Sequence, residues 1–455
     1  MKNRQGKEVF FFEKKKTFPC LTLLSALFLP ALAHTVPPVL SAYQFVNAIG
    51  VDTHISYTDG LYSNLPLVIS DMRALGIDQV RDGIGDGANG SAPFSSYVTL
   101  AQAGIHFTVG IDGVDDHNNA AILRQLALVD RLEEMVPGSV TAIAGANEIN
   151  NGPVTYTPAG GKPETGIAAA VAQQADLYAD VHADETLAGV PVIYFTGYFK
   201  SAKDTLGPDP MVAPVIADFD DQHPYPGYFK GSHAPAAWAS RNCGATSGPM
   251  PYPNLGAQDC QTAPGVFSET GYSTSSGGTS PVTDQQKADY EPDLLFDAID
   301  PTEGNVARVD LYDLMDAYAS GSRQGDDLWG LFAYAAGAQK FTPAATNIAH
   351  IVKYVADTDE NAGSFVPAAV DYTITGMPPT GHCLLIEQSN GTYILAIWAE
   401  PAVLTTTATV TAHFPSVSPD ISVYDPVTGK TSTSHNARSI ALTVSAYPVL
   451  VKFTQ

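Results

Sequence analysis

Between residues 48 and 357, short apolar runs rich in β-branched side chains alternate with longer segments of helical periodicity. The helical segments, at 65–75, 120–135, 167–183 and 284–299, place apolar side chains three and four residues apart. Strands that alternate with helices in this way form parallel sheets. The eight candidate strands are residues 48–54, 79–82, 106–112, 141–146, 190–195, 218–222, 265–268 and 308–314. Because a closed (β/α)8 barrel has eight strands, the sequence predicts an α/β TIM barrel over residues 34–357.

The pattern changes after residue 357. Runs at 383–387, 393–398 and 406–414 alternate between apolar and polar residues or are β-branched. Asn390-Gly391 lies between two of these runs and is the strongest short signal for a hairpin. Residues 358–455 are therefore predicted to form a smaller antiparallel β-sandwich after the barrel.

The N-terminus has the pattern of a signal peptide. Residues 1–16 carry six lysine and arginine side chains, and the apolar run 18–32 follows. The small residues Ala31 and Ala33 end this run in the pattern of a signal peptidase site. We therefore expect residues 1–33 to be cleaved and the protein to be secreted or periplasmic, as a monomer free of the membrane. The alternative is an uncleaved anchor, although the run is shorter than the roughly 20 residues of a spanning helix.

The charge of the chain excludes one class of partner. Loss of residues 1–33 would remove six basic residues and two glutamates, which moves the formal net charge from −24 to −28. Nucleic-acid binding requires a basic surface, so it is not expected. The negative charge favours a neutral sugar chain as substrate over a polyanionic one bound across a broad face. A local basic pocket is still compatible with this charge.

Two cysteines lie in a long segment with little periodicity, residues 226–264, which is rich in glycine, proline and serine. Cys243 and Cys260 are 17 residues apart, and in an oxidising compartment we expect them to pair. Closing such a loop is worth roughly 3 kcal/mol. The spacing matches no zinc motif, and no metal or cofactor is expected. We expect this long segment to cross the active-site face.

Two glutamates end candidate strands of the barrel. Asn147-Glu148 follows strand four, and Glu269 ends strand seven before a glycine turn. Catalytic residues of TIM barrels lie at the C-terminal ends of the strands, so both carboxyl groups are expected on one rim. Each glutamate alone could instead be a helix cap or a surface carboxylate. As a pair about 5–5.5 Å apart, they would suit retaining glycoside hydrolysis.

Other polar residues end further strands. Arg81 could hydrogen-bond a nucleophilic carboxylate and keep it ionised, or form a surface pair with an aspartate. His223 and Tyr225 could orient that carboxylate and line a sugar site, although a proline-rich turn with a core tyrosine is the alternative. His54 and Asp112 could hydrogen-bond sugar hydroxyls, or be structural.

The order Arg, Asn-Glu, His-x-Tyr and Glu on strands two, four, six and seven resembles the clan A glycoside hydrolases, nearest to families 39, 30 and 5. These are retaining (β/α)8 enzymes. The resemblance implies that Glu148 is the acid/base and Glu269 the nucleophile, and that Asn147 holds the sugar 2-hydroxyl. Residues 328–332, and 340–345 before a helix, also resemble the segment that closes such barrels.

One feature departs from the clan, which commonly has tryptophan at the end of strand eight. Here Tyr312 or Asp313 stands at that place, and Tyr272, just after strand seven, is a further candidate for sugar contact. The resemblance implies a glycosidase acting on a poly- or oligosaccharide by double displacement. Transglycosylation at the same site and a polysaccharide-binding barrel without catalysis are the alternatives. The sugar, its linkage and endo or exo action stay open.

Overall fold

The computed structural model describes residues 38–111, 117–149, 154–197, 214–226, 265–275, 281–302, 306–319, 328–401 and 404–455. Residues Pro37–Gln455 form one compact unit. The predicted signal peptide, the predicted Cys243–Cys260 disulfide and Asp112 lie outside the described residues. No helix in the described ranges is long and apolar enough to cross a membrane.

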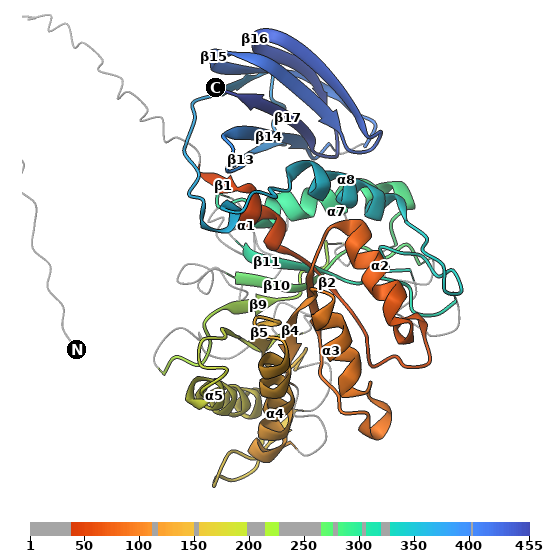
Figure 1. Cartoon of the computed structure of the whole chain (residues 1–455), viewed down its shortest axis with the longest axis vertical. Helices are drawn as coiled ribbons and strands as arrows, with labels where there is room; N and C mark the ends of the chain where they lie inside the picture. The colour runs from red at the N-terminus through yellow and green to blue at the C-terminus, as the bar shows by residue number, and fades with distance from the viewer. Residues whose placement is uncertain are drawn as a thin grey trace, which may run out of the picture. The chain divides into compact units, whose positions relative to one another are not determined.

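Eight parallel strands form the first sheet of the described chain (Figure 1). They are β2 (Ile49–Asp52), β3 (Gln79–Asp82), β4 (His106–Gly110), β5 (Val140–Ala144), β8 (Val192–Ile193), β9 (Asp220–Gln222), β10 (Gly265–Thr270) and β11 (Val306–Leu311). Their order is β8-β5-β4-β3-β2-β11-β10-β9, and a parallel bridge between Ile193 and Phe219 joins the two ends. The sheet is therefore a barrel, and the predicted (β/α)8 fold is confirmed.

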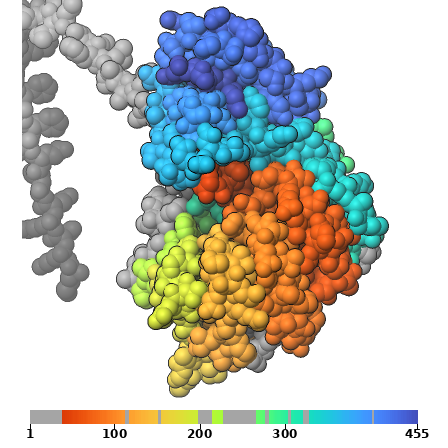
Figure 2. Space-filling model, in the orientation of Figure 1, coloured from red at the N-terminus to blue at the C-terminus, as the bar shows by residue number. Residues whose placement is uncertain are grey.

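Helices cover the outside of the barrel: α2 (Leu65–Leu75), α3 (Phe94–Gln102), α4 (Asn119–Met135), α5 (Ile167–Ala183), α7 (Asp284–Ile299) and α8 (Pro343–Val355). In α2, the side chain of Asn64 accepts from Leu67 N–H at the start, and Gly76 ends the helix with φ 76°. The buried face of α2 includes Val68, Met72 and Leu75. In the space-filling view, helices α2 to α5 (orange to yellow-green) hide the strands (Figure 2).

A buried polar layer fills the barrel near the starts of its strands. Arg308 bonds Asp310 Oδ1 through Nε at 2.9 Å and Gln79 Oε1 through Nη1 at 2.9 Å. Gly50 makes room for this pair, because a Cβ there would lie 2.0 Å from Asp310 Oδ1. The charge of Arg308 is thus matched inside the barrel, at the end opposite the strand termini that carry the candidate site.

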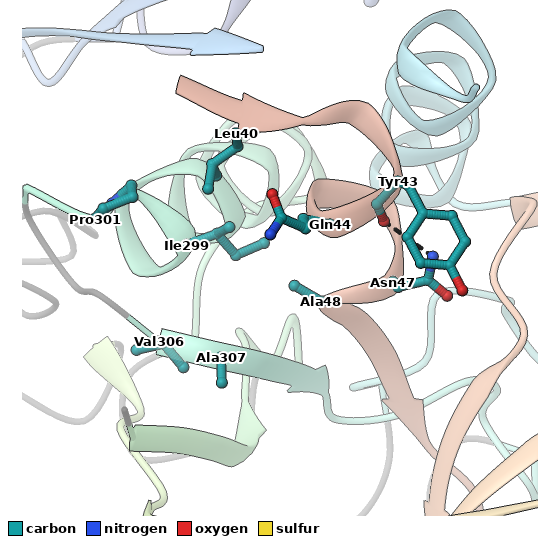
Figure 3. A pocket seen from close by; sticks show the side chains of 9 residues that line it. All are labelled: Leu40, Tyr43, Gln44, Asn47, Ala48, Ile299, Pro301, Val306 and Ala307. Carbon is teal, nitrogen blue, oxygen red and sulfur yellow. Dashed lines mark hydrogen bonds between the residues drawn. The ribbon is translucent and has the colours of Figure 1, made fainter. Parts of the chain in front are cut away.

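The same end of the barrel carries a pocket of about 350 Å³ (Figure 3). It is lined by α1 (Ala42–Asn47), the end of α7 and the start of β11. Ile299 and Val306 give it apolar walls, and the side chains of Gln44 and Asn47 add polar groups (Figure 3). Since chemistry in TIM barrels occurs at the C-terminal ends of the strands, this pocket is not the expected site.

The second sheet follows the barrel. It contains β1 (Val39–Ser41), β12 (Thr373–Thr375), β13 (Gly381–Glu387), β14 (Thr392–Ala399), β15 (Ala408–Asp425), β16 (Lys430–Val444) and β17 (Val449–Thr454). All its pairings are antiparallel except that of β1 with β13. The predicted Asn390-Gly391 turn joins β13 to β14, with φ 81° at Gly391. The parallel strand β1, from before the barrel, was not predicted.

Alternate residues of this sheet belong to two different cores. Ile386, Ile394 and Trp398 belong to the core cluster that contains the barrel helices. Their neighbours on the opposite face belong to a second core, which both halves of the long strand β15 help to enclose. Within it, Phe414 packs on Phe453 with ring centroids 4.1 Å apart. The predicted C-terminal β-sandwich is therefore confirmed. Trp398 Nε1 connects it to α7 by donating a hydrogen bond to Asp297 Oδ1 at 3.0 Å.

Candidate active site

The C-terminal ends of four barrel strands bring six of the predicted residues together. Arg81 belongs to β3, Asn147 and Glu148 follow β5, His223 and Tyr225 follow β9, and Glu269 belongs to β10. Parallel strands in a barrel end on the same rim, which is why residues up to 188 positions apart in the sequence make direct hydrogen bonds here.

Glu269 is a buried carboxylate with a donor on each oxygen. Arg81 Nη1 donates to Oε1 at 2.7 Å and Tyr225 Oη donates to Oε2 at 2.8 Å. Burial by itself raises the pKa of Glu269, but the charges of His223 and Arg81 and the hydrogen bonds from Tyr225 and Arg81 outweigh it and lower the pKa to about 2. Glu269 is therefore ionised at neutral pH, as a nucleophile must be.

Arg81 connects this carboxylate to two neighbours. Its Nη1 lies 3.2 Å from Asp52 Oδ1, and its Nη2 donates to Asn147 Oδ1 at 2.7 Å. Burial lowers the pKa of Arg81, but the carboxylates of Glu269, Asp52 and Asp221 raise it further and keep the guanidinium charged. The bond from Arg81 fixes the orientation of the Asn147 amide group.

Glu148 is positioned by an unusual backbone conformation. Its φ is 43°, which is rare for a residue other than glycine, and its N–H donates to Thr196 Oγ1 at 2.9 Å. Its Oε1 lies 3.1 Å from His223 Nδ1. Strained backbone of this kind is concentrated at functional sites, where the surrounding contacts hold it. Here the carboxyl group of Glu148 lies close to the imidazole of His223 and to Glu269.

The two carboxyl groups are close enough to act on one glycosidic bond. One oxygen of Glu148, one oxygen of Glu269 and a ring nitrogen of His223 lie within 4.8 Å of one another. Inverting enzymes separate their carboxyl groups by roughly 6.5–9.5 Å to admit a water, whereas retaining enzymes use about 5–5.5 Å. The same three groups could hold a metal ion, but Arg81 and Tyr225 already donate to both oxygens of Glu269, which favours proton chemistry.

Behind His223 lies a chain of buried polar groups. His223 Nε2 is 3.0 Å from Ser268 Oγ. Ser268 in turn bonds Asp221 twice, through Oγ to Oδ2 at 2.7 Å and through N–H to Oδ1 at 3.1 Å. Burial raises the pKa of Asp221 to about 6, against the lowering effect of His223, Arg81 and the Ser268 hydrogen bonds. Ser268 was not singled out from the sequence; a polar residue inside an apolar strand was the available signal.

No known family model and no curated protein matches the sequence. Solved structures do match. A family 39 glycoside hydrolase from the gut symbiont Bacteroides cellulosilyticus WH2 has a TM-score of 0.55 at 14% identity, over 92% of this chain and 83% of that chain. A monomeric β-xylosidase from Caulobacter crescentus CB15 has a TM-score of 0.52 at 11% identity, over 92% and 97%.

A third match is the family 39 enzyme of Xanthomonas axonopodis pv. citri, with a TM-score of 0.50 at 12% identity, over 92% of this chain and 96% of that chain. The chain has the fold of these glycoside hydrolases. The resemblance drawn from the strand-end motifs is thus confirmed at the level of the fold. Since 92% of the chain is covered in each case, the likeness includes both the barrel and the sheet that follows it.

An aromatic wall borders the carboxylates of this glycosidase fold. Trp329 packs edge-to-face on Tyr225 and Tyr312, with ring centroids 5.1 and 5.8 Å away. The tryptophan expected after strand eight is replaced there by Tyr312, and the structure brings Trp329 in from a later segment. Lys287 on α7 is buried and donates to the backbone oxygens of Trp329 and Gly330, the second at 3.2 Å. The sequence placed Trp329 in the segment that resembles a barrel-closing one but did not assign it to the site, because its anchor Lys287 lies 42 residues away.

His54 stands at the edge of the same wall. Its ring stacks on Tyr57 at 4.6 Å and meets Tyr312 edge-on at 5.3 Å. Burial lowers the pKa of His54 to about 4, with Arg81 adding to the effect and Glu269 opposing it. The ring is therefore neutral at physiological pH, and its Nε2 lies 3.8 Å from Asp313 Oδ2. A neutral imidazole in this place can hydrogen-bond a sugar hydroxyl.

Tyr272, by contrast, lies in the core. Its exposed fraction is 1%, and its ring packs on Tyr290 of α7 with centroids 5.3 Å apart. The chain turns just before it at Gly271, where φ is 144°. Tyr272 thus packs between the barrel and α7, and its contact with a sugar stays a prediction.

Proposed function

We propose that the protein is a secreted retaining glycoside hydrolase that cleaves O-glycosidic bonds of a poly- or oligosaccharide. The observation that carries the proposal is Glu269, ionised and held by Arg81 and Tyr225, within 4.8 Å of Glu148. Secretion rests on the signal-peptide pattern of residues 1–33 alone. The fold shared with family 39 enzymes supports the reaction class.

In the first step, Glu269 attacks the anomeric carbon while the bond to the leaving oxygen breaks. Glu148 transfers its proton to that oxygen, which departs as an alcohol. Arg81 and Tyr225 hold the two oxygens of Glu269 in fixed directions, so the lone pair that attacks is set before the substrate arrives. The product of this step is a glycosyl ester of Glu269.

In the second step, water attacks the anomeric carbon and the ester bond to Glu269 breaks. Glu148, now a carboxylate, takes the proton of the water and returns to its starting state. The amide nitrogen of Asn147 donates to the sugar 2-hydroxyl in both steps, while Arg81 holds the amide oxygen. Two displacements at one carbon give net retention of the anomeric configuration.

Two other functions use the same residues. Transglycosylation replaces the attacking water by a second sugar hydroxyl. A polysaccharide-binding barrel without catalysis would gain nothing from an ionised carboxylate held by two donors beside a second carboxyl group. We therefore favour hydrolysis, and product analysis separates it from transfer.

The test is a screen of the purified protein against soluble polysaccharides and aryl glycosides, beside the variant Glu269→Gln. Glu387→Gln is the matched control, because Glu387 is also buried but lies on β13 of the second sheet. We expect sugar release by the parent and the control, and a loss of roughly a thousandfold or more in Glu269→Gln. Release that survives in Glu269→Gln would show that another residue is the nucleophile.

A further inference from the structure

The hydrogen atoms of the Asp221–Ser268–His223 chain can be assigned from its contacts. A serine hydroxyl carries one proton, and Ser268 Oγ directs it to Asp221 Oδ2 at 2.7 Å. The backbone N–H of Ser268 donates to the other oxygen of Asp221, which favours the carboxylate form of that side chain. Ser268 Oγ then has only lone pairs for His223 Nε2 at 3.0 Å. Nε2 must therefore carry a hydrogen.

This assignment decides what Nδ1 of His223 can do. Nδ1 lies 3.1 Å from Glu148 Oε1 and 3.5 Å from Glu269 Oε2. Each oxygen of Glu269 already accepts a hydrogen bond, and Glu148 Oε1 is the nearer of the two oxygens, so we assign Glu148 as the partner of Nδ1. One proton must lie between them, either on Glu148 and donated to Nδ1, or on Nδ1 and donated to Glu148.

We propose that Asp221 and Ser268 are positioning residues that hold His223 with Nε2 protonated, so that His223 and Glu148 share the proton delivered to the leaving group. In glycosylation this proton moves from the pair to the leaving oxygen as the glycosidic bond breaks. In deglycosylation the attacking water returns one proton to the pair as the Glu269 ester breaks. This inference rests on the proposed glycosidase function and extends it from Glu148 to three residues behind it.

The groups around the imidazole support a shared proton. Glu148 faces His223 from the end of β5, Glu269 from β10 and Asp221 from β9, while Arg81 of β3 lies beside Glu269 and Asp221. The imidazole itself is 1% exposed, so bulk water does not supply or remove its protons directly. Three carboxyl groups and one guanidinium surround it, and a proton held here offsets their excess negative charge.

The first measurement reads the imidazole without any substrate. The protein is labelled with ¹⁵N-histidine, and the ring signals of His223 are identified by their absence in His223→Gln. We expect Nε2 of His223 to be protonated in the parent at pH 7, where Asp221, whose pKa burial raises to about 6, is ionised. In Ser268→Ala, where the acceptor is lost, we expect this ring signal to shift. A neutral ring with hydrogen on Nδ1 and none on Nε2 would overturn the proposal.

The second measurement compares leaving groups. For Ser268→Ala we expect kcat/KM to fall about 10–100-fold on a phenyl glycoside, which needs the proton, and less than about threefold on a dinitrophenyl glycoside, which does not. Ser268→Thr, which keeps the hydroxyl, should restore the parent ratio between the two glycosides.

Ser139→Ala is the matched control, because Ser139 is 2% exposed and its hydroxyl has no hydrogen-bond partner among the described residues. It should keep the parent ratio between the two glycosides. An equal loss on both substrates in Ser268→Ala would mean a structural role and would overturn the proposal. If the parent releases no sugar from any substrate, the proposed function fails, while the ring signals of His223 still decide the proton assignment.

Discussion

Removal of the Tyr225 hydroxyl group should shift the acid limb of the pH profile of kcat/KM to higher pH. Tyr225→Phe deletes the donor to Glu269 Oε2 at 2.8 Å and keeps the ring that packs on Tyr312 and Trp329. A hydrogen bond to a charged group contributes about 1.5–3 kcal/mol, and one pKa unit corresponds to about 1.4 kcal/mol. The pKa of Glu269, about 2 in the parent, should therefore rise by about one to two units.

The sign follows from the role of Glu269. A depressed carboxyl pKa keeps the nucleophile ionised, and activity is lost as pH falls through that pKa. The kcat/KM profile of Tyr225→Phe, measured from pH 2.5 to pH 8 on an aryl glycoside, should thus fall within this range, at about pH 3 to 4. The parent, with a Glu269 pKa of about 2, should lose little activity down to about pH 3.

Tyr354→Phe is the matched control for this variant. Tyr354 on α8 stacks on Tyr424, and its hydroxyl has no hydrogen-bond partner among the described residues. Its profile should coincide with that of the parent. An acid limb that does not move in Tyr225→Phe would refute the claim that this hydroxyl stabilises the ionised nucleophile.

Three further changes should have separate effects. Glu148→Gln should lower kcat/KM for phenyl glycosides by about 10²–10⁴ and spare dinitrophenyl glycosides, by steady-state kinetics. Asp293→Asn should raise the melting temperature at pH 7 by roughly 2 °C and by less at pH 4. Burial raises the pKa of Asp293, so the stability that its protonated form contributes is lost as pH rises. The oxygens of Asp293 also have no hydrogen-bond partner among the described residues. Gly50→Ala should destabilise the fold by roughly 1–3 kcal/mol in denaturant unfolding, because its Cβ would meet Asp310 Oδ1 at 2.0 Å.

Local patterns were enough to predict most of the barrel. The ranges 65–75, 167–183 and 284–299 coincide with α2, α5 and α7, because helical periodicity and capping are properties of neighbouring residues. Strand ends were less certain. The run 190–195 predicted a six-residue strand, whereas only Val192–Ile193 pairs in the sheet as β8. Strand length depends on the partner strands, which the local sequence does not specify.

The candidate site also contains residues that local patterns predict and residues that they do not. Glu148, Glu269 and Arg81 could be predicted because each ends an apolar strand, and the barrel brings such ends together. Trp329 and Ser268 could not. Trp329 reaches the site through a segment held by a distant lysine, and Ser268 acts through contacts made by β9. The β1 strand likewise depends on β13, which begins more than 300 residues later.

The most direct test of the account is the configuration of the first sugar released. A glycoside that the protein cleaves is mixed with it in an NMR tube, and the anomeric proton signals are followed before mutarotation mixes them. Glu269 and Glu148, with oxygens within 4.8 Å, predict that the first product keeps the configuration of the substrate. A first product of opposite configuration would contradict the double displacement and the role of Glu269 as nucleophile.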